Sequence, residues 1–358
     1  MQSRRDFDTL TPEIRVLINA QDIPVAAKAD IVSVNVIEEV NASGTFAITL
    51  LCWDGVEMKV KWIDDEIFKA GNVVEIQMGY RDRLKSLFKG EITGMEPEFA
   101  NAEPPILTVL GYDRSHRILR KHRTESYINM KDSDIANQIA GNQGLRCDIT
   151  DTKVTIAYIL QHNQTDLEFL RQRANRIGFE TGVIDQTLYF RPRKNNSEEI
   201  LTLAREVELL EFYPRLSTIE QLENVAVQGW DPRNKEKILA EARVDDTSSL
   251  VGASVSGPAM VRKAFPDKSG GVSTHLAIGS QAEAEQLATG WFKDMSLQYV
   301  IADGLCIGLP ELRAGTLINI EGLGKRFSGH YYVTGTEHSY RPNRGYRTAF
   351  SARRDATS

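Results

Sequence analysis

Apolar and polar residues alternate with a period of two near the start of the chain. The alternation covers residues 13–19 (EIRVLIN), 44–52 (GTFAITLLC) and 72–78 (NVVEIQM), with a further strand expected at 30–40. This pattern is typical of antiparallel strands that bury one face. The expected buried positions are Ile14, Val16 and Ile18, then Phe46, Ile48 and Leu50, then Val74, Ile76 and Met78. Residues 10–115 are therefore predicted to form a small antiparallel β-barrel.

One segment of this barrel has a counterpart late in the chain. Residues 69–80 read KAGNVVEIQMGY, and residues 313–324 read RAGTLINIEGLG. Each is followed by a strand containing a β-branched residue, Thr, Gly, any residue and Glu, at 92–96 and at 333–337, and then by a third strand. The interval from Gly71 to Gly94 is 23 residues, and that from Gly315 to Gly335 is 20, a difference of three that one turn can absorb. We interpret this as a duplicated unit; the alternative, that two Gly-bounded meanders are merely alike, stays open.

The pattern between the copies changes to a helical period. Residues 161–180 predict a helix that begins at Thr165, with Glu168 completing a capping box, and ends at Gly178. Its apolar face comprises Leu167, Leu170, Ala174 and Ile177. With a shorter helix in 132–145 and a hairpin that turns at Asp185 and Gln186, residues 116–200 are predicted to form an inserted α+β domain.

The second barrel is predicted to be split into residues 201–250 and 305–352. The insert, 251–304, contains turn-rich stretches and one helix with a capping box of Ser280 and Glu283. The apolar face of that helix comprises Ala284, Leu287, Ala288, Trp291 and Met295. The predicted fold class is thus mainly β with α+β: two similar small antiparallel β-barrels and an inserted α+β domain.

Composition narrows the functional classes. The chain has 358 residues and a net charge of −6, so no broad basic surface favours direct nucleic-acid recognition. No apolar stretch is long enough for a membrane-spanning segment, and the N-terminal residues do not resemble a signal peptide. Three widely separated cysteines argue against a disulfide framework and fit a reducing cytoplasm. We expect Cys147 and Cys306 to be buried structural thiols.

No catalytic, cofactor or metal motif stands out. None of the six histidines lies in a metal-ligand spacing, so no metal site and no cofactor are expected. His116 and His122 flank a basic run that is expected to be a solvated or interfacial edge, and His330 and His338 are expected at a strand end or a subunit contact. Asp245 and Asp246 are expected to be solvated.

Carboxylate chemistry is also weakly supported. Glu168 and Glu180 could be imagined as the acid and base of a glycosidase, but Glu168 already has a capping role. Asp132 and Asp134 resemble the start of a calcium loop, but the Gly and the terminal Glu of that loop are missing. The chain is therefore not expected to be an enzyme.

Three sets of motifs, in order, resemble the phage late-control D proteins and the N-terminal half of VgrG proteins. They are LQHNQTDLEFLRQRANRIGFE (160–180), LFKGEITGMEPEF (87–99) with LTVLGYD (107–113), and AEAEQLA, RAGTLINIEGLG and GHYYVTGTEHSY towards the end. The resemblance covers about 10–352. VgrG chains continue into an OB-fold and a β-helix spike, whereas this sequence stops at FSARRDATS, so the spike is expected to be a separate polypeptide.

The resemblance implies a structural baseplate hub of a contractile injection system: a phage tail, an R-type bacteriocin or a type VI-like particle. Such hubs are homotrimers whose six barrels form a pseudo-six-fold ring between a hexameric tail tube and a trimeric spike. The implied partners are further copies of the chain, the tail tube protein, the spike protein and other baseplate proteins. Synthesis in the bacterial cytoplasm and assembly into the particle are implied as well.

Seven residues are candidates for contacts or ring geometry. Gly94 and Gly335 lie inside predicted strands, where Gly marks a bulge or a close backbone approach, and Glu96 and Glu337 follow them in both copies. Arg171, Arg173 and Arg176 lie on the predicted helix and are expected to face baseplate or spike partners. The alternatives to a hub are a tail-associated peptidoglycan hydrolase and, less favoured, a carbohydrate-binding β-protein.

Overall fold

The computed structural model describes residues 11–101, 103–193, 201–231, 234–244, 251, 255–265, 272–275 and 278–357. Its largest element is a 13-stranded sheet in which all pairings except one are antiparallel. The main path of this sheet is, in order, β16 (Leu209–Leu216), β21 (Val300–Ile307), β24 (Gly345–Arg354), β23 (Gly329–Arg341), β3 (Ile31–Glu39), β4 (Thr45–Leu51), β9 (Ile106–Tyr112), β8 (Arg83–Glu98), β7 (Val73–Tyr80), β1 (Pro12–Ile18) and β2 (Gln21–Asp22). Off this path, β22 (Leu317–Glu321) pairs with β23, and β15 (Leu201–Ala204) pairs parallel with β22. The prediction of a mainly β, antiparallel fold is confirmed.

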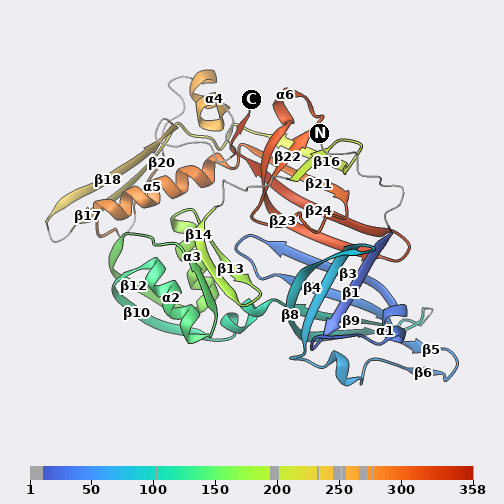
Figure 1. Ribbon diagram of the computed structural model, residues 1–358. Coiled ribbons are helices and arrows are strands. Elements are labelled where there is room, and N and C mark those ends of the chain that lie inside the picture. Colours follow the sequence, from blue (N-terminus) through green and yellow to red (C-terminus); the bar gives the residue numbers. More distant parts are fainter. Residues whose placement is uncertain are drawn as a thin grey trace.

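The same strand order occurs twice in this sheet. The first half-sheet runs β1-β7-β8-β9-β4-β3, and the second half-sheet runs β15-β22-β23-β24-β21-β16. The two are joined where β3 pairs with β23, so one continuous sheet crosses both (Figure 1). The three-residue difference in spacing lies in the strands and not in the turn, so the expected explanation by one turn is wrong. β7 and β8 are the longer strands and meet in a tight hairpin, whereas the shorter strands β22 and β23 are separated by a longer turn that contains α6 (Gly324–Phe327).

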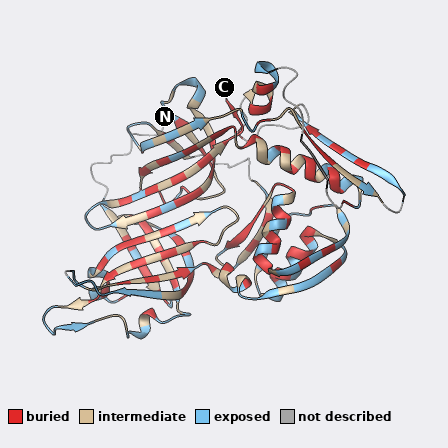
Figure 2. Ribbon diagram, turned by 180° about the vertical axis from the view of Figure 1, so that it is seen from behind, coloured by how far each residue is buried: buried red, intermediate tan, exposed pale blue. Residues whose placement is uncertain are grey.

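The alternating residues of the first half-sheet form its core. All nine predicted positions, from Ile14 to Met78, are buried. The second half-sheet has a separate core that includes Ile318, Ile320, Val333 and Phe350. Figure 2 shows that buried residues concentrate on the sheets and on the helical layer.

Residues 122–192 form an α+β region. It comprises two small sheets and two helices: β10 (His122–Lys131) with β12 (Thr155–Thr165), β11 (Arg146–Ile149) with β14 (Thr187–Pro192) and β13 (Phe179–Ile184), α2 (Asp132–Asn142) and α3 (Asp166–Arg176). Helix α3 begins with the predicted capping box, in which the Thr165 N–H donates to Glu168 (2.8 Å). Its four predicted apolar residues are buried, and the hairpin turns at Asp185 as expected.

Residues 224–243 differ from the expected second barrel. There, β17 (Asn224–Asp231) pairs with β18 (Glu236–Arg243) and with β20 (Val272–His275) in a separate sheet. Helix α5 (Gln281–Ser296) packs on β17 and β18, and their apolar residues join the core of the α+β region. The alternation in 224–243 resembles that of a barrel strand, but its apolar face is covered by α5. Strand β21 also begins at Val300, before the predicted boundary.

Short elements complete the described chain. They are α1 (Val25–Ala29), β5 (Trp53–Asp54) with β6 (Lys59–Val60), η2 (Glu66–Phe68), η3 (Arg114–Leu119), β19 (Val255–Ser256) with β25 (Ala356–Thr357), and α4 (Gly257–Ala264). Asp245 and Asp246 lie outside the described residues. Within the described ranges, no helix has the length and apolar character needed to cross a membrane.

Candidate assembly interface

The two glycines singled out from the sequence occupy matching irregularities. The pairing of β8 with β9 shifts register between Ile92 and Gly94, and that of β23 with β24 shifts between Val333 and Gly335. The glycine turn that precedes β7 is hydrogen-bonded to β8, because the Gly71 N–H donates to the Ile92 carbonyl (2.8 Å). The turn that precedes β22 is bonded to β23 in the same way, because the Gly315 N–H donates to the Val333 carbonyl (2.9 Å). Each glycine therefore lies at a β-bulge, which re-aims the strand beyond it.

The surroundings of the two glycines are different. A Cβ atom on Gly335 would lie 3.3 Å from Glu39 Cγ and 3.4 Å from the Glu38 carbonyl oxygen, because β3 runs alongside β23. A Cβ atom on Gly94 would have no neighbour within 4 Å. Both glycines thus lie at a bulge, and the other alternative expected for a strand glycine, a close backbone approach, is present at Gly335 only.

The two candidate glutamates also occupy equivalent positions. Glu96 is opposite Thr108, Glu337 is opposite Ala349, and both side chains are exposed. On its other side Glu337 faces Ile37 of β3. No described strand pairs with the same side of Glu96. The end of β8 thus matches the end of β23 residue by residue, but among the described strands none pairs with its outer side.

Side chains reinforce the junction between the half-sheets. The Arg313 guanidinium donates to Glu38 of β3 (2.7 Å through Nε) and to the Leu87 carbonyl of β8 (2.8 Å). His338 is fully buried; its Nε2–H donates to the Leu312 carbonyl (3.0 Å), and its Nδ1 accepts from the Tyr346 hydroxyl (2.8 Å). Burial, reinforced by the charge of Arg313, lowers the pKa of His338 to about 3. His338 is therefore a neutral residue of the protein interior, and its expected place at a strand end or subunit contact is wrong.

A cavity of about 420 Å³ lies beside the junction, bounded by both half-sheets and the α+β region. Its lining includes Glu38, Asp113, Tyr189 and Arg313. The Asp113 carboxylate accepts from the Gly44 N–H (2.6 Å) and the Ser115 N–H (2.8 Å), yet burial raises the pKa of Asp113 to about 6. These side chains hold three segments together, and the hydrogen bonds of Asp113 are structural ones.

Two of the three candidate arginines of α3 form ion pairs within the fold. Arg173 is 6% exposed and its guanidinium donates to both carboxylate oxygens of Asp132 (2.6 and 3.1 Å). Arg176 donates to Glu283 of α5 (3.0 Å), and Arg171 is partly buried. The expectation that this set faces a partner is wrong for Arg173, because its charge is neutralised within the fold. Arg176 joins α3 to α5.

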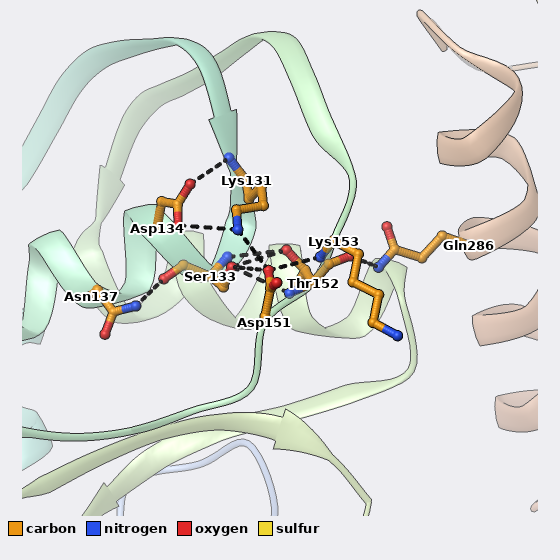
Figure 3. Close-up of polar contacts among 8 residues, drawn as sticks. All are labelled: Lys131, Ser133, Asp134, Asn137, Asp151, Thr152, Lys153 and Gln286. Carbon is orange, nitrogen blue, oxygen red and sulfur yellow. Dashed lines mark hydrogen bonds and ion pairs between the residues drawn. The ribbon is translucent and has the colours of Figure 1, made fainter.

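The acidic residues near α2 are also neutralised (Figure 3). Lys131 forms ion pairs with Asp151 (2.8 Å) and Asp134 (3.8 Å), which raise the pKa of Lys131. Asp151 also accepts from Ser133, and Gln286 of α5 donates to the Thr152 carbonyl (3.2 Å). This cluster ties the α+β region to α5. Among the described residues, no group of three or more His, Cys, Asp or Glu side chains could hold a metal ion.

Three other sequence expectations change with the structure. Cys306 is buried as predicted, and burial raises the pKa of Cys306 to about 12, but Cys147 is exposed. The basic run after His116 folds in part as η3, where His116 is hydrogen-bonded to buried Glu91 (2.8 Å) and Arg117 forms an ion pair with it. Ser280 caps α5, but Glu283 bonds to the Gly279 N–H and to Arg176 instead of completing the box. The sequence analysis did not identify Arg313 as a contact residue, although Arg313 begins the motif RAGTLINIEG at the position that Lys69 occupies in the first copy.

A family model described as the Alg8 N-terminal domain matches residues 8–341. The chain belongs to that family. No curated protein matches the sequence. The Alg8 N-terminal domain match does not name the late-control D proteins, so that finer assignment is a proposal.

Solved structures show which fold this Alg8 N-terminal domain chain has. A 43 kDa prophage tail protein from Shewanella oneidensis is similar, with a TM-score of 0.70 at 13% identity, covering 97% of this chain and 100% of that one. A tail protein from Neisseria meningitidis has a TM-score of 0.68 at 10% identity, with 96% of both chains covered. An Escherichia coli component of the type VI secretion system has a TM-score of 0.57 at 14% identity, covering 96% of this chain and 76% of that one. The chain therefore has the fold of these tail proteins.

Proposed function

We propose that this chain is a structural hub in the baseplate of a contractile injection system, with no catalysis of its own. Three copies would form a ring to which each subunit contributes its two half-sheets as barrel-like units, giving six similar units around a three-fold axis. One end of the ring would bind a hexameric tail tube and the other a separate trimeric spike, with other baseplate proteins outside. Synthesis in the bacterial cytoplasm is part of this proposal.

The repeated strand order carries the proposal. A chain with two equivalent β units can present similar surfaces six times in a trimer, while its true symmetry stays three-fold. The matched bulges at Gly94 and Gly335 show that the equivalence extends to single residues. The similarity to tail proteins over nearly the whole chain supports the same class of particle.

The solution mass tests this function. Light scattering across a concentration series should give a mass near three times 40.1 kDa for the chain alone or, after addition of the cognate spike protein, that mass plus the mass of the bound spike, because mass action favours the trimer that the spike binds. A chain that remains monomeric with the spike present would contradict the hub. A zymogram on cell-wall material should show no lysis, whereas a cleared band would favour the hydrolase alternative.

A further inference from the structure

The junction between the half-sheets provides a template for a contact between copies. In it, Thr336 is opposite Glu38, Glu337 is opposite Ile37 and Tyr340 is opposite Val34. The repeat assigns an equivalent to each of these residues. At the end of β8 and just beyond it, the equivalents of Thr336, Glu337 and Tyr340 are Met95, Glu96 and Phe99. In β16, the equivalents of Glu38, Ile37 and Val34 are Leu216, Arg215 and Phe212. This correspondence is consistent in six strand pairings, three in each half-sheet, and the register shift between Ile31 and Ser33 recurs between Leu209 and Glu211.

Both equivalent edges are open in the single chain. β16 ends the sheet, and no described strand pairs with the outer side of β8 beyond Ile92 (Figure 1). Met95 is 39% exposed where Thr336 is 3% exposed, and Phe99 and Tyr213 are 62% and 66% exposed. Edges of this kind are templates for another strand.

We propose that residues 94–99 of one copy pair antiparallel with residues 212–217 of the next copy, in the register of the β23–β3 junction. The partner is a second copy of this chain, and the proposal rests on the self-association proposed above. The contact is heterologous, because β8 meets β16 and not another β8. Heterologous contacts produce closed rings when the rotation between neighbours closes.

The side chains of the two edges are complementary in this register. Glu96 would lie opposite Arg215 of the neighbouring copy; both side chains are exposed, and neither forms an ion pair with another described residue. On the other face, Met95 would lie opposite Leu216, and Phe99 opposite Phe212. Opposite charges and apolar pairs directly across two strands both stabilise a sheet. One face of the contact is thus apolar and the other polar, as in a strand pair that covers a core.

Prolines limit this contact. Pro97 and Pro214 would lie opposite each other, at the position where His338 faces Val36 in the junction. Neither proline has a backbone N–H to donate, so the ladder between copies is interrupted there. Proline on an edge strand also discourages pairing with unrelated strands. The specificity of the contact between copies therefore depends on its side-chain pairs and not on the backbone ladder. This contact is weaker than the junction within the chain.

Cysteine cross-linking tests the register. In a background with Cys147→Ser, the double variant Glu96→Cys/Arg215→Cys should form disulfides between copies under mild oxidation, because Cβ atoms directly opposite in a sheet are about 4.5–5.5 Å apart. Non-reducing gels should show species of two and three chain masses. The chain contains its own geometric control: Ile37→Cys/Glu337→Cys should cross-link within one chain and stay at the monomer mass. Shifting the register with Glu98→Cys/Arg215→Cys should reduce the yield several-fold.

Charge exchange gives an independent readout. Glu96→Arg and Arg215→Glu should each weaken self-association about tenfold or more in light scattering, and the double variant should restore most of it, because it exchanges the charges without removing the pair. Two outcomes would overturn the interface while the hub function stands. In the first, the Glu96→Cys/Arg215→Cys variant forms a trimer without a cross-link between these two positions. In the second, both single charge variants associate like the wild type. A chain that stays monomeric in every experiment would overturn the interface, and only its failure with the spike protein would overturn the hub.

Discussion

The two half-sheets share a strand order and differ in what covers them. In the second, β23 continues past its bulge and is covered by β3, so Thr336 and His338 are buried. In the first, the equivalent residues Met95 and Pro97 are exposed. The same difference separates Arg313, which is held by Glu38, from Lys69, which pairs with exposed Glu66. The same strand order therefore occurs in two settings: the second half-sheet makes this contact inside the chain, and the first presents the corresponding edge to solvent.

The largest expected effect comes from His338. The pKa of this residue is about 3 in the fold, whereas the unfolded chain takes up a proton near pH 6.5, so the unfolded state binds more protons between these values. His338 therefore lowers stability as the pH falls from 6.5 towards 3. His338→Gln removes this dependence. Relative to the wild type, the free energy of unfolding of the variant should rise by about 3 kcal/mol between pH 7.5 and pH 4, measured by urea unfolding.

Asp113 is the matched control for this pH dependence. Its pKa is raised to about 6 in the fold, so the folded state binds more protons between about pH 4 and pH 6, and Asp113 contributes stability as the pH falls through that window. Relative to the wild type, the free energy of unfolding of Asp113→Asn should therefore fall between pH 7.5 and pH 4, opposite to the change expected for His338→Gln. The assignment of the pH dependence to the junction would be wrong if both variants shifted the same way.

The junction arginine should have the next largest effect. Arg313→Met leaves the carboxylate of Glu38 without its partner in a partly buried place, which should cost about 2–3 kcal/mol of unfolding free energy. Lys69→Met, the same change at the equivalent position of the first copy, removes an exposed ion pair and should cost less than about 0.5 kcal/mol. Equal losses for the two variants would show that the copies are not specialised in this way. Chemical denaturation of both in one buffer gives the answer.

The smallest effect distinguishes the two glycines. Gly335→Val places a branched side chain against Glu38 and Glu39 and should destabilise the chain by about 1–2 kcal/mol. Gly94→Val meets open space, so the melting temperature of the monomer should stay within about a degree of the wild type, while self-association decreases. A thermal melt and a light-scattering series on the same preparations separate these effects. If Gly94→Val melted early, the first half-sheet would contain an unrecognised contact.

The sequence predicted the local elements well where one physical signal decided them. The alternation in residues 72–78 and the capping box at Thr165 appear in the structure as expected, because each depends on near neighbours. The repeat was visible as Ala-Gly and Thr-Gly-x-Glu motifs, and it located both bulges.

Contacts between distant segments could not be predicted in this way. The alternation of β17 and β18 does not tell which layer covers their apolar face, and α5 does so instead of a barrel partner. The charge of Arg173 suggested a surface role, but Asp132 lies 41 residues away in the sequence and neutralises it inside the fold. Glu38, 275 residues from Arg313, is equally invisible to a pattern search.

The β3–β23 pairing also constrains how the chain reaches its native state. Val34 pairs with Tyr340, which is 306 residues later (340 − 34). At a synthesis rate of roughly 5–20 residues per second, β3 waits on the order of 15–60 s after its own emergence before its partner strand exists. During that interval β3 can pair with β4 on one side, but its other edge has no partner strand, and open edges of this kind are templates for pairing with other chains. Because non-local pairing of this kind is slow and leaves an edge open, we expect the yield of soluble protein to rise when chaperones are co-expressed.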